Sequence, residues 1–408
     1  MWSIIKLWIK DHYHKILNSI SFYPALIGLL FLILAIVMMG FDFSIQGKDF
    51  KSQIPWLSIK DSTTARSIIS AVAAGVISLA VFSFSMVMIV LNQAASQMSN
   101  RVLDKLIGNR FQQIVLGIYI GTIVYSFFLL STIRDIDSGL YIPSLSIYLL
   151  IIITIFDLFL FIYFLHYITQ SVKYEVIIKR IYENTLEVLE HNCNVGHEVK
   201  TIVNVESEQL IYTPTSGIFE TIDKRELLKL CDENDIIIQL LVTPGTSLLK
   251  GMPIAKISKD LEEDIKKEIG RTLFLHKSES IEENYFYGFR QLTEIAMKAL
   301  SPGINDPGTA IIALRSLFEL YAYRINHFPL SFIKNKEGQA RIILKNLSFD
   351  KIFEDTIIPI YNYGKNDRLI QQEMLLLLPQ LQSISQNEKV EKLISLLKEK
   401  TKNEDFSF

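Results

Sequence analysis

The stretch FYPALIGLLFLILAIVMMG, from Phe22 to Gly40, is an unbroken apolar run. A helix needs roughly 20 such residues to cross a bilayer, so this run has the length of one span. Lysines, tryptophans and isoleucines are interspersed before it, which is typical of a helix lying in the membrane interface. No cleavage site of small residues follows the run, so it does not match a secretory signal. The sequence therefore predicts a retained transmembrane helix, preceded by an interfacial segment at residues 1–21.

Three more apolar runs follow, and they concentrate the hydrophobicity of the chain in its first 170 residues. The whole chain is 50% hydrophobic and has a mean hydropathy of +0.28, whereas residues 171–408 have the composition of a soluble region. We therefore expect a four-helix transmembrane domain at residues 22–170. The three further spans are predicted at Ser67–Leu91, Ile114–Ile133 and Ser144–Ile168.

Basic residues between the spans predict the orientation. The loop between the second and third spans contains Arg101, Lys105 and Arg110, and the fourth span is followed by Lys173 and Lys179. The first outer loop is also basic, which weakens the pattern. Under the positive-inside rule we expect a multi-pass protein of the cell membrane with both termini in the cytoplasm.

The second span carries a stripe of small and polar residues. At helical spacing these residues share one face, and two interpretations remain open. The face lines a pore or solute path, or it allows close packing of helices, as Gly117 and Gly121 of the third span also would. The candidate path-lining residues are Ser67, Ala71, Ala74, Ser78, Ser85 and Asn92.

Asp157 lies near the middle of the fourth span. An ionised carboxylate at that depth costs roughly 2.5–3.5 kcal/mol on insertion scales, so the side chain is expected to face the bundle interior, find hydrogen-bond partners or stay protonated. An intramembrane acid is a functional candidate by default. The alternative is a protonated or hydroxyl-paired acid that only fixes helix packing.

After the spans, the pattern changes to that of an α+β region. A helical connector is expected at residues 171–194, a β-rich module at 195–258, a helical domain at 259–400 and a frayed tail at 401–408. The phrase VTPGTSLLKGMPIAKI resembles the turn pattern of barrel-sandwich folds, so we expect a small β-barrel-like module. The predicted fold class is an α-helical integral membrane protein with a cytoplasmic α+β region.

The segment SPGINDPGT forms a predicted corner between two helices of the C-terminal region. Asp306 is a favoured N-cap and the proline after it a favoured first helical residue, while Gly303 can take a positive φ. Asn305 is the residue without an assigned structural task. The alternative to a purely structural corner is a site for a ligand or a partner. Its candidate residues are Arg290, Glu294, Ser301, Asn305 and Asp306.

Several classes of function receive no support from the sequence. The net charge of −2 gives no basic footprint for nucleic acid. The spacing of Cys193 and Cys231 is not that of metal ligands, so we interpret them as two reduced thiols. The seven histidines do not cluster in the sequence. We find no motif of a nucleotide-binding loop, a nucleophile elbow or a zinc protease. We therefore predict no cofactor and no metal, and the absence of a recognisable catalytic motif favours a protein that is not an enzyme, with an enzyme of unfamiliar site as the alternative.

The blocks ARSIISAVAAGVISLAVFSFSMVMIVLNQAASQMSNRVLDKL and RQLTEIAMKALSPGINDPGTA together resemble the bacterial domain of unknown function 2254 family. The resemblance covers most of residues 20–325, and ALSPGINDP is its most specific part. It implies a membrane location, four spans and a cytoplasmic tail, and no established activity. The chain departs from the family pattern at Glu283 and Asn284, where a Gln-Asp pair is usual, and at Asp157, where a small or apolar residue is usual.

Three hypotheses of function follow. The first is a homo-oligomeric channel or transport-related protein for ions or small solutes, with the second span along the path and the C-terminal region as vestibule or gate. The second is a membrane-anchored sensor or scaffold whose C-terminal region binds a ligand or a protein. The third is an enzyme acting at the membrane surface.

Overall fold

The chain forms two compact units, which we call the membrane unit, Met1–Lys173, and the C-terminal unit, Tyr174–Phe408. The computed structural model describes residues 21–57, 59, 61–97, 110–136, 139–196, 205, 209–276, 281 and 284–403. The interfacial segment predicted at residues 1–21 and the end of the predicted tail therefore lie almost wholly outside the described residues.

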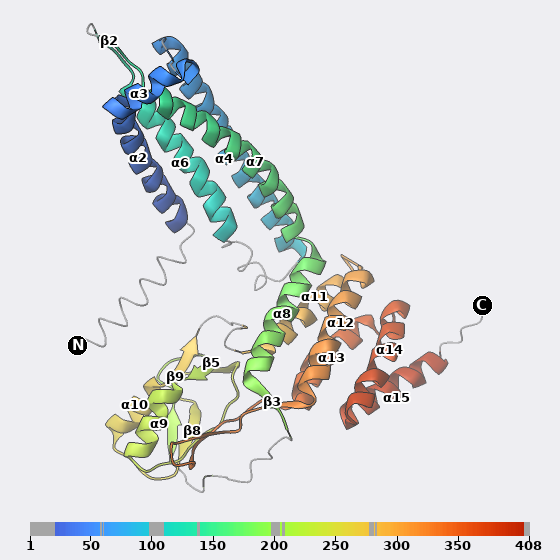
Figure 1. The fold of residues 1–408 in the computed structure, drawn as a ribbon. Helices are drawn as coiled ribbons and strands as arrows, with labels where there is room; N and C mark the ends of the chain where they lie inside the picture. The colour runs from blue at the N-terminus through green and yellow to red at the C-terminus, as the bar shows by residue number, and fades with distance from the viewer. Residues whose placement is uncertain are drawn as a thin grey trace. The chain divides into compact units, whose positions relative to one another are not determined.

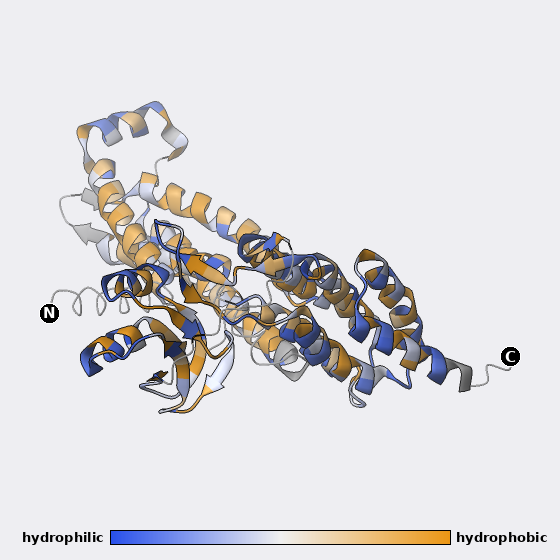
Figure 2. Ribbon diagram, turned by 90° about the horizontal axis from the view of Figure 1, so that it is seen from below, coloured by the Kyte–Doolittle hydropathy of each residue, from blue (hydrophilic) through white to orange (hydrophobic). Residues whose placement is uncertain are grey.

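The membrane unit contains four helices that are long and apolar enough to cross a membrane, so the four predicted spans are confirmed as helices of that kind. Figure 2 shows them as predominantly hydrophobic. The helix α3 (Ile45–Gln53), the short helix η1 (Pro55–Leu57) and the hairpin of β1 (Arg134–Ile136) and β2 (Gly139–Tyr141) lie between them. The four long helices are α2 (Phe22–Phe43), α4 (Ser62–Gln97), α6 (Arg110–Thr132) and α7 (Ser144–Ser171) (Figure 1).

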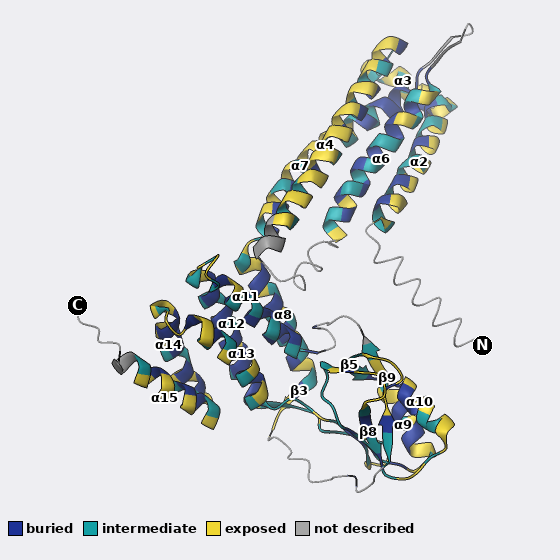
Figure 3. Cartoon of the chain, turned by 180° about the vertical axis from the view of Figure 1, so that it is seen from behind, coloured by how far each residue is buried: buried dark blue, intermediate teal, exposed yellow. Residues whose placement is uncertain are grey.

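The helix α6 is the central element of the membrane unit, since it packs against α2, α4 and α7. Figure 3 shows α6 as mostly buried or half-buried, whereas α4 and α7 present long exposed faces. Two glycines permit the contact with α2. A Cβ atom at Gly117 would lie 2.7 Å from the Ile27 side chain, and one at Gly121 would lie 2.6 Å from the Phe31 ring. The predicted packing role of this GxxxG pair is confirmed.

Most helices of the C-terminal unit pack into one bundle. The first of them, α8 (Tyr174–Asn192), lies within the predicted connector and packs against α11 (Phe286–Ala299) and α12 (Pro307–Arg324). Gly288 on α11 permits this contact, because a Cβ atom there would overlap the side chain of Thr185. The remaining helices of the bundle are α13 (Phe349–Gly364), α14 (Arg368–Ile384) and α15 (Glu388–Asn403).

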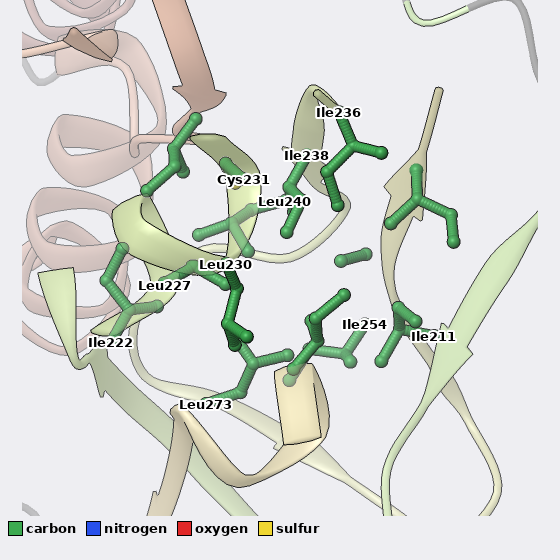
Figure 4. Close-up of a cluster of buried hydrophobic side chains, with 14 of the residues drawn as sticks. Ile211, Ile222, Leu227, Leu230, Cys231, Ile236, Ile238, Leu240, Ile254 and Leu273 are labelled. Carbon is green, nitrogen blue, oxygen red and sulfur yellow. The ribbon is translucent and has the colours of Figure 1, made fainter. Parts of the chain in front are cut away.

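The β-rich part of this unit contains two sheets in the described residues, apart from the short pair β3–β10. One sheet has the strand order β11-β12-β6-β8-β4 and the other β7-β5-β9. The helices α9 (Lys224–Glu233) and α10 (Glu263–Arg271) contribute to the apolar core between them, which contains Leu227, Leu230 and Ile254 (Figure 4). The strands are β3 (Cys193–Val195), β4 (Leu210–Tyr212), β5 (Gly217–Ile222), β6 (Ile238–Leu240), β7 (Thr246–Leu248), β8 (Pro253–Ile257), β9 (Leu273–His276), β10 (His327–Pro329), β11 (Phe332–Lys334) and β12 (Ala340–Ile343).

The predicted β-barrel-like module is wrong, because the described strands form open sheets and not a closed barrel. The first sheet does not close on itself. Its last two strands, β11 and β12, come from a segment that lies far from the other three strands in the sequence. The hairpin β11–β12 lies inside the region predicted to be helical, and β12 pairs in parallel with β6, Ile342 opposite Ile238. Gly338, at φ 83°, makes the turn of this hairpin.

Candidate functional site

The predicted path-lining residues of α4 lie on the outside of the membrane unit. Ser67, Ala71, Ala74, Ser78, Ser85 and Asn92 are all exposed. The opposite face of the helix buries Ala65, Ile69, Ala73 and Val76 against the rest of the unit. The stripe therefore does not line a path inside a single chain.

The exposed face of α4 changes character halfway along the helix. Between Ser67 and Ser78 it also includes Ser70 and Gly75, so every exposed residue there except Ile77 is small. The hydroxyls of Ser78 and Ser85 donate to the carbonyls of Ala74 and Val81, each at 2.9 Å, so they tolerate lipid. The first half allows close approach of another helix. The second half exposes the bulky residues Val81, Phe82, Phe84, Met88 and Ile89.

Asp157 is completely buried in the membrane unit. It is the fourteenth residue of α7, about 20 Å along the helix from its start at 1.5 Å per residue, and hence near mid-span. Neither carboxylate oxygen has a hydrogen-bond partner among the residues that the structure describes. The expectation that this acid faces the bundle interior is confirmed, but it is not paired there.

The surroundings of Asp157 contain hydroxyl groups from two other helices. Thr122 on α6 lies beside the carboxylate, but its hydroxyl donates to the Ile118 carbonyl at 3.1 Å. The buried hydroxyl of Tyr119, also on α6, is within electrostatic reach of Asp157 and lies beside Ser83 of α4. Asp157 thus lies near two hydroxyl groups of α6, and Ser83 of α4 lies beside one of these, that of Tyr119.

A cavity of about 220 Å³ is lined by residues of α4, α6 and α7, but not by Asp157, Tyr119 or Thr122. Its wall is mostly apolar and includes Val87 and Leu116, together with Phe164 of α7. Ser83 and Gln113 are its buried polar residues. Because Ser83 also lies beside Tyr119, the cavity adjoins the buried hydroxyl of Tyr119.

The helix–helix corner is confirmed as a capped turn. Asp306 is the N-cap of α12 and Pro307 its first residue. One oxygen of Asp306 accepts from the Thr309 amide at 3.1 Å and the other from the Thr309 hydroxyl at 2.6 Å. The carboxylate is thus engaged within the corner, which favours the structural interpretation.

Asn305 has the structural task that the sequence analysis did not find. Its φ is 50°, in the left-handed region, which asparagine adopts more readily than most residues. Gly303 was expected to take this role, but it does not have a positive φ. Asn305 is exposed, and its amide donates to the Ser301 carbonyl at 2.9 Å.

The other candidate residues of the corner have local contacts. The Ser301 hydroxyl donates to the Lys298 carbonyl at 2.6 Å. The guanidinium of Arg290 lies 5.9 Å from the centroid of the Tyr287 ring, where it forms a cation–π contact. A ligand or partner at Arg290 and Glu294 stays a prediction.

Two adjoining cavities in the C-terminal unit were missed by the sequence analysis. One, of about 280 Å³, is lined by Arg324, Phe328 and Leu347 among others. The second, of about 500 Å³, is lined by residues that include Glu220 and Asn284. They share lining residues. No sequence motif marks them, because their walls come from segments that are far apart in the chain. Among the described residues, no group of three or more His, Cys, Asp or Glu side chains could hold a metal ion.

The four helices that are long and apolar enough to cross a membrane, followed by an α+β unit, are consistent with a membrane protein. A model of the family described as predicted membrane protein (DUF2254) matches residues 17–380, so the chain belongs to that family. Uncharacterized proteins of Mycobacterium bovis and Mycobacterium tuberculosis are 24% identical to it over 341 residues. The match covers 79% of this chain but only 64% of each relative, so the chain spans less than two thirds of their length. No solved structure matches.

Proposed function

We propose that the protein is transport-related and that Asp157 takes up and releases a proton during transport through the membrane unit. The observation that carries the proposal is the complete burial of this carboxyl group near mid-span without a hydrogen-bond partner among the described residues. A buried polar group without a partner costs about 1–3 kcal/mol. A purely structural acid would be expected to recover that cost through hydrogen bonds.

The surroundings of the acid support this role. The hydroxyls of Thr122 and Tyr119 lie near the carboxyl group, and that of Ser83 lies beside Tyr119. Such hydroxyls can exchange hydrogen bonds with a carboxyl group or with a water molecule. The cavity that reaches Ser83 supports access from one side of the membrane unit. Ionisable residues inside membrane spans commonly mark proton or ion pathways.

The proposal includes a homo-oligomer in the cell membrane, with both termini cytoplasmic as the basic loops predict. The exposed small face of α4 between Ser67 and Ser78 is suited to a second copy of the chain, because small residues let helix backbones approach closely. In such an oligomer four of the predicted path-lining residues lie at the contact between subunits, namely Ser67, Ala71, Ala74 and Ser78. Leucine at Ala71 or Gly75 should shift the oligomer toward monomers in detergent, measured by light scattering, whereas Val81→Leu, on the bulky half, should not.

Proton flux into liposomes tests the role of Asp157. The full chain is reconstituted with a pH-sensitive dye inside the vesicles, and a potassium gradient with valinomycin drives the flux. Wild-type vesicles should acidify faster than empty ones, and Asp157→Asn should remove this difference. Thr154→Val is the matched control, since the Thr154 hydroxyl donates to the Leu150 carbonyl of the same helix, at 2.7 Å. Equal proton flux in vesicles with the wild type and with Asp157→Asn would contradict the proposal.

The second candidate function, a membrane-anchored sensor, is favoured by the two adjoining cavities of the C-terminal unit. Together they have the size of a small-molecule site. A sensor and a transport protein are compatible, because a ligand in the C-terminal unit can control transport. The enzyme hypothesis stays an untested prediction.

A further inference from the structure

We propose that the C-terminal unit binds a small phosphate ester of the size of a mononucleotide, with the phosphate at Arg324. This inference deepens the sensor function and does not depend on proton transport by Asp157. It rests on a buried guanidinium that has no counterion and on the cavities beside it.

Arg324 is the last residue of α12 and is only 1% exposed. Its Nη1 donates to the His327 carbonyl and its Nη2 to the Leu347 carbonyl, both at 2.9 Å. Its Nε has no hydrogen-bond partner, and no carboxylate forms an ion pair with it, among the residues that the structure describes. Burying a charge without a counterion is unfavourable, so a buried arginine of this kind is expected to meet an anion.

The groups beside the guanidinium do not neutralise it. The Tyr285 side chain lies near both Arg324 and Cys193. Burial raises the pKa of the Tyr285 phenol and also that of the Cys193 thiol, so both stay uncharged at neutral pH. Arg341 shows the usual arrangement, since it pairs with Asp232 at 3.1 Å and with Asp235 at 3.0 Å.

Arg324 is one of the residues that line the cavity of about 280 Å³. Phe328, whose ring centroid is 5.6 Å from the guanidinium carbon, lines it, and so does Leu347, whose carbonyl accepts from Nη2. Lys345 also lines the cavity and adds a second positive charge. A phosphate matches this site, because guanidinium groups bind phosphate oxygens through short charge-assisted hydrogen bonds.

The cavity of about 500 Å³ would hold the rest of the ligand, and it shares Lys345 and Leu347 with the first. Its wall includes Glu220, a buried carboxylate that accepts from the Tyr287 hydroxyl at 2.8 Å. Asn284 is 6% exposed, and its Nδ2 has no hydrogen-bond partner in the described part of the chain. A carboxylate that accepts and an amide that donates fit a nucleobase, which carries both donors and acceptors on its edge.

The competing account gives Arg324 a structural role only. In that account the guanidinium serves to bind two carbonyls and to complement the C-terminal end of α12. It predicts that phosphate compounds do not bind. The two accounts therefore differ in a measurable property of the intact protein.

The test is binding of AMP and of inorganic phosphate to the full chain in detergent, by calorimetry and thermal unfolding at constant ionic strength. Both compounds should bind saturably, and AMP more tightly, because it also fills the second cavity. Adenosine and sodium acetate should bind at least about tenfold more weakly than AMP, since they lack the phosphate. Arg324→Gln should weaken AMP binding by about tenfold to a hundredfold.

Two further variants keep the test decisive if Arg324→Gln does not fold. Ser331→Phe fills the first cavity without changing a charge, since Ser331 lines it, and it should also abolish AMP binding. Arg341→Gln is the matched control and should bind AMP as the wild type does. Absence of saturable binding to the wild type, unchanged binding to Ser331→Phe, or acetate binding as tightly as phosphate would each overturn the proposal. Proton flux is measured separately, so either proposal can fail alone.

Discussion

Two completely buried acids of the membrane unit, Asp42 and Asp157, have opposite surroundings. Asp42, near the end of α2, accepts from Lys51 at 2.7 Å on one oxygen. Its other oxygen accepts from the amide of Ser146 at 2.8 Å and from the hydroxyl of that residue at 3.0 Å. Asp157 has no such bond in the described part of the chain.

The difference separates a structural acid from a functional one. The bonds of Asp42 connect the end of α2 with α3 and with the start of α7, so its charge is neutralised and its position fixed. Asp157 forms no hydrogen bond of this kind to any described residue, although Thr122 and Tyr119 lie near it. A group that must gain and lose a proton cannot be held permanently in one charge state by a strong partner.

The largest effect is expected at Asp42. Replacement by alanine leaves Lys51 without its carboxylate and the Ser146 amide without its acceptor. Breaking a buried ion pair in this way costs about 3–5 kcal/mol, so the free energy of unfolding in detergent should fall by that amount. Asp49→Ala, at an exposed acid on α3, is the control and should change stability little. If Asp42→Ala is as stable as the control, the ion pair has no structural role.

A change of opposite sign is expected at Asp157. Replacement by leucine removes a buried polar group without a partner, so the free energy of unfolding should rise by about 1–3 kcal/mol. The measurement is thermal or denaturant unfolding, with Thr154→Val as the control on the same helix. A loss of stability in Asp157→Leu as large as that in Asp42→Ala would make Asp157 a structural acid too.

A third acid, Asp306, extends the comparison to the C-terminal unit. Its two bonds to Thr309 cap α12, and loss of an N-cap costs about 0.5–2 kcal/mol. Asp306→Ala should therefore destabilise the protein by about this amount and leave proton flux unchanged. Asn305→Gly should preserve stability, because glycine tolerates a positive φ. A loss of proton flux in Asp306→Ala would show that the corner between α11 and α12 takes part in transport.

The smallest effect is expected at Cys231, whose buried thiol should be unreactive in the folded protein. Burial raises the pKa of its thiol to about 12, so the reactive thiolate is scarce at neutral pH and increases only as the pH rises toward that value. Maleimide should modify this thiol only after unfolding, which mass spectrometry can check. Rapid modification of the folded protein at neutral pH would show that this part of the core opens.

The sequence predicted the spans and the burial of Asp157 because long apolar runs allow few other structures. It could not predict whether the small face of α4 packs inside the membrane unit or lies on its outside. Periodicity shows which residues share a face of a helix, but not what that face contacts. The hairpin β11–β12 was missed because its strands are short and pair with β6, which is distant in sequence. The burial of Arg324 was missed because a cation in the last turn of a helix is expected to lie at the protein surface.

Infrared difference spectra of the reconstituted protein test the central claim most directly. Spectra recorded at acidic and alkaline pH reveal each carboxyl group that gains or loses a proton between them. We predict a carboxyl stretching band that is present in the wild type and in Thr154→Val and absent from Asp157→Asn. Identical difference spectra of the wild type and Asp157→Asn would contradict the claim that Asp157 exchanges a proton.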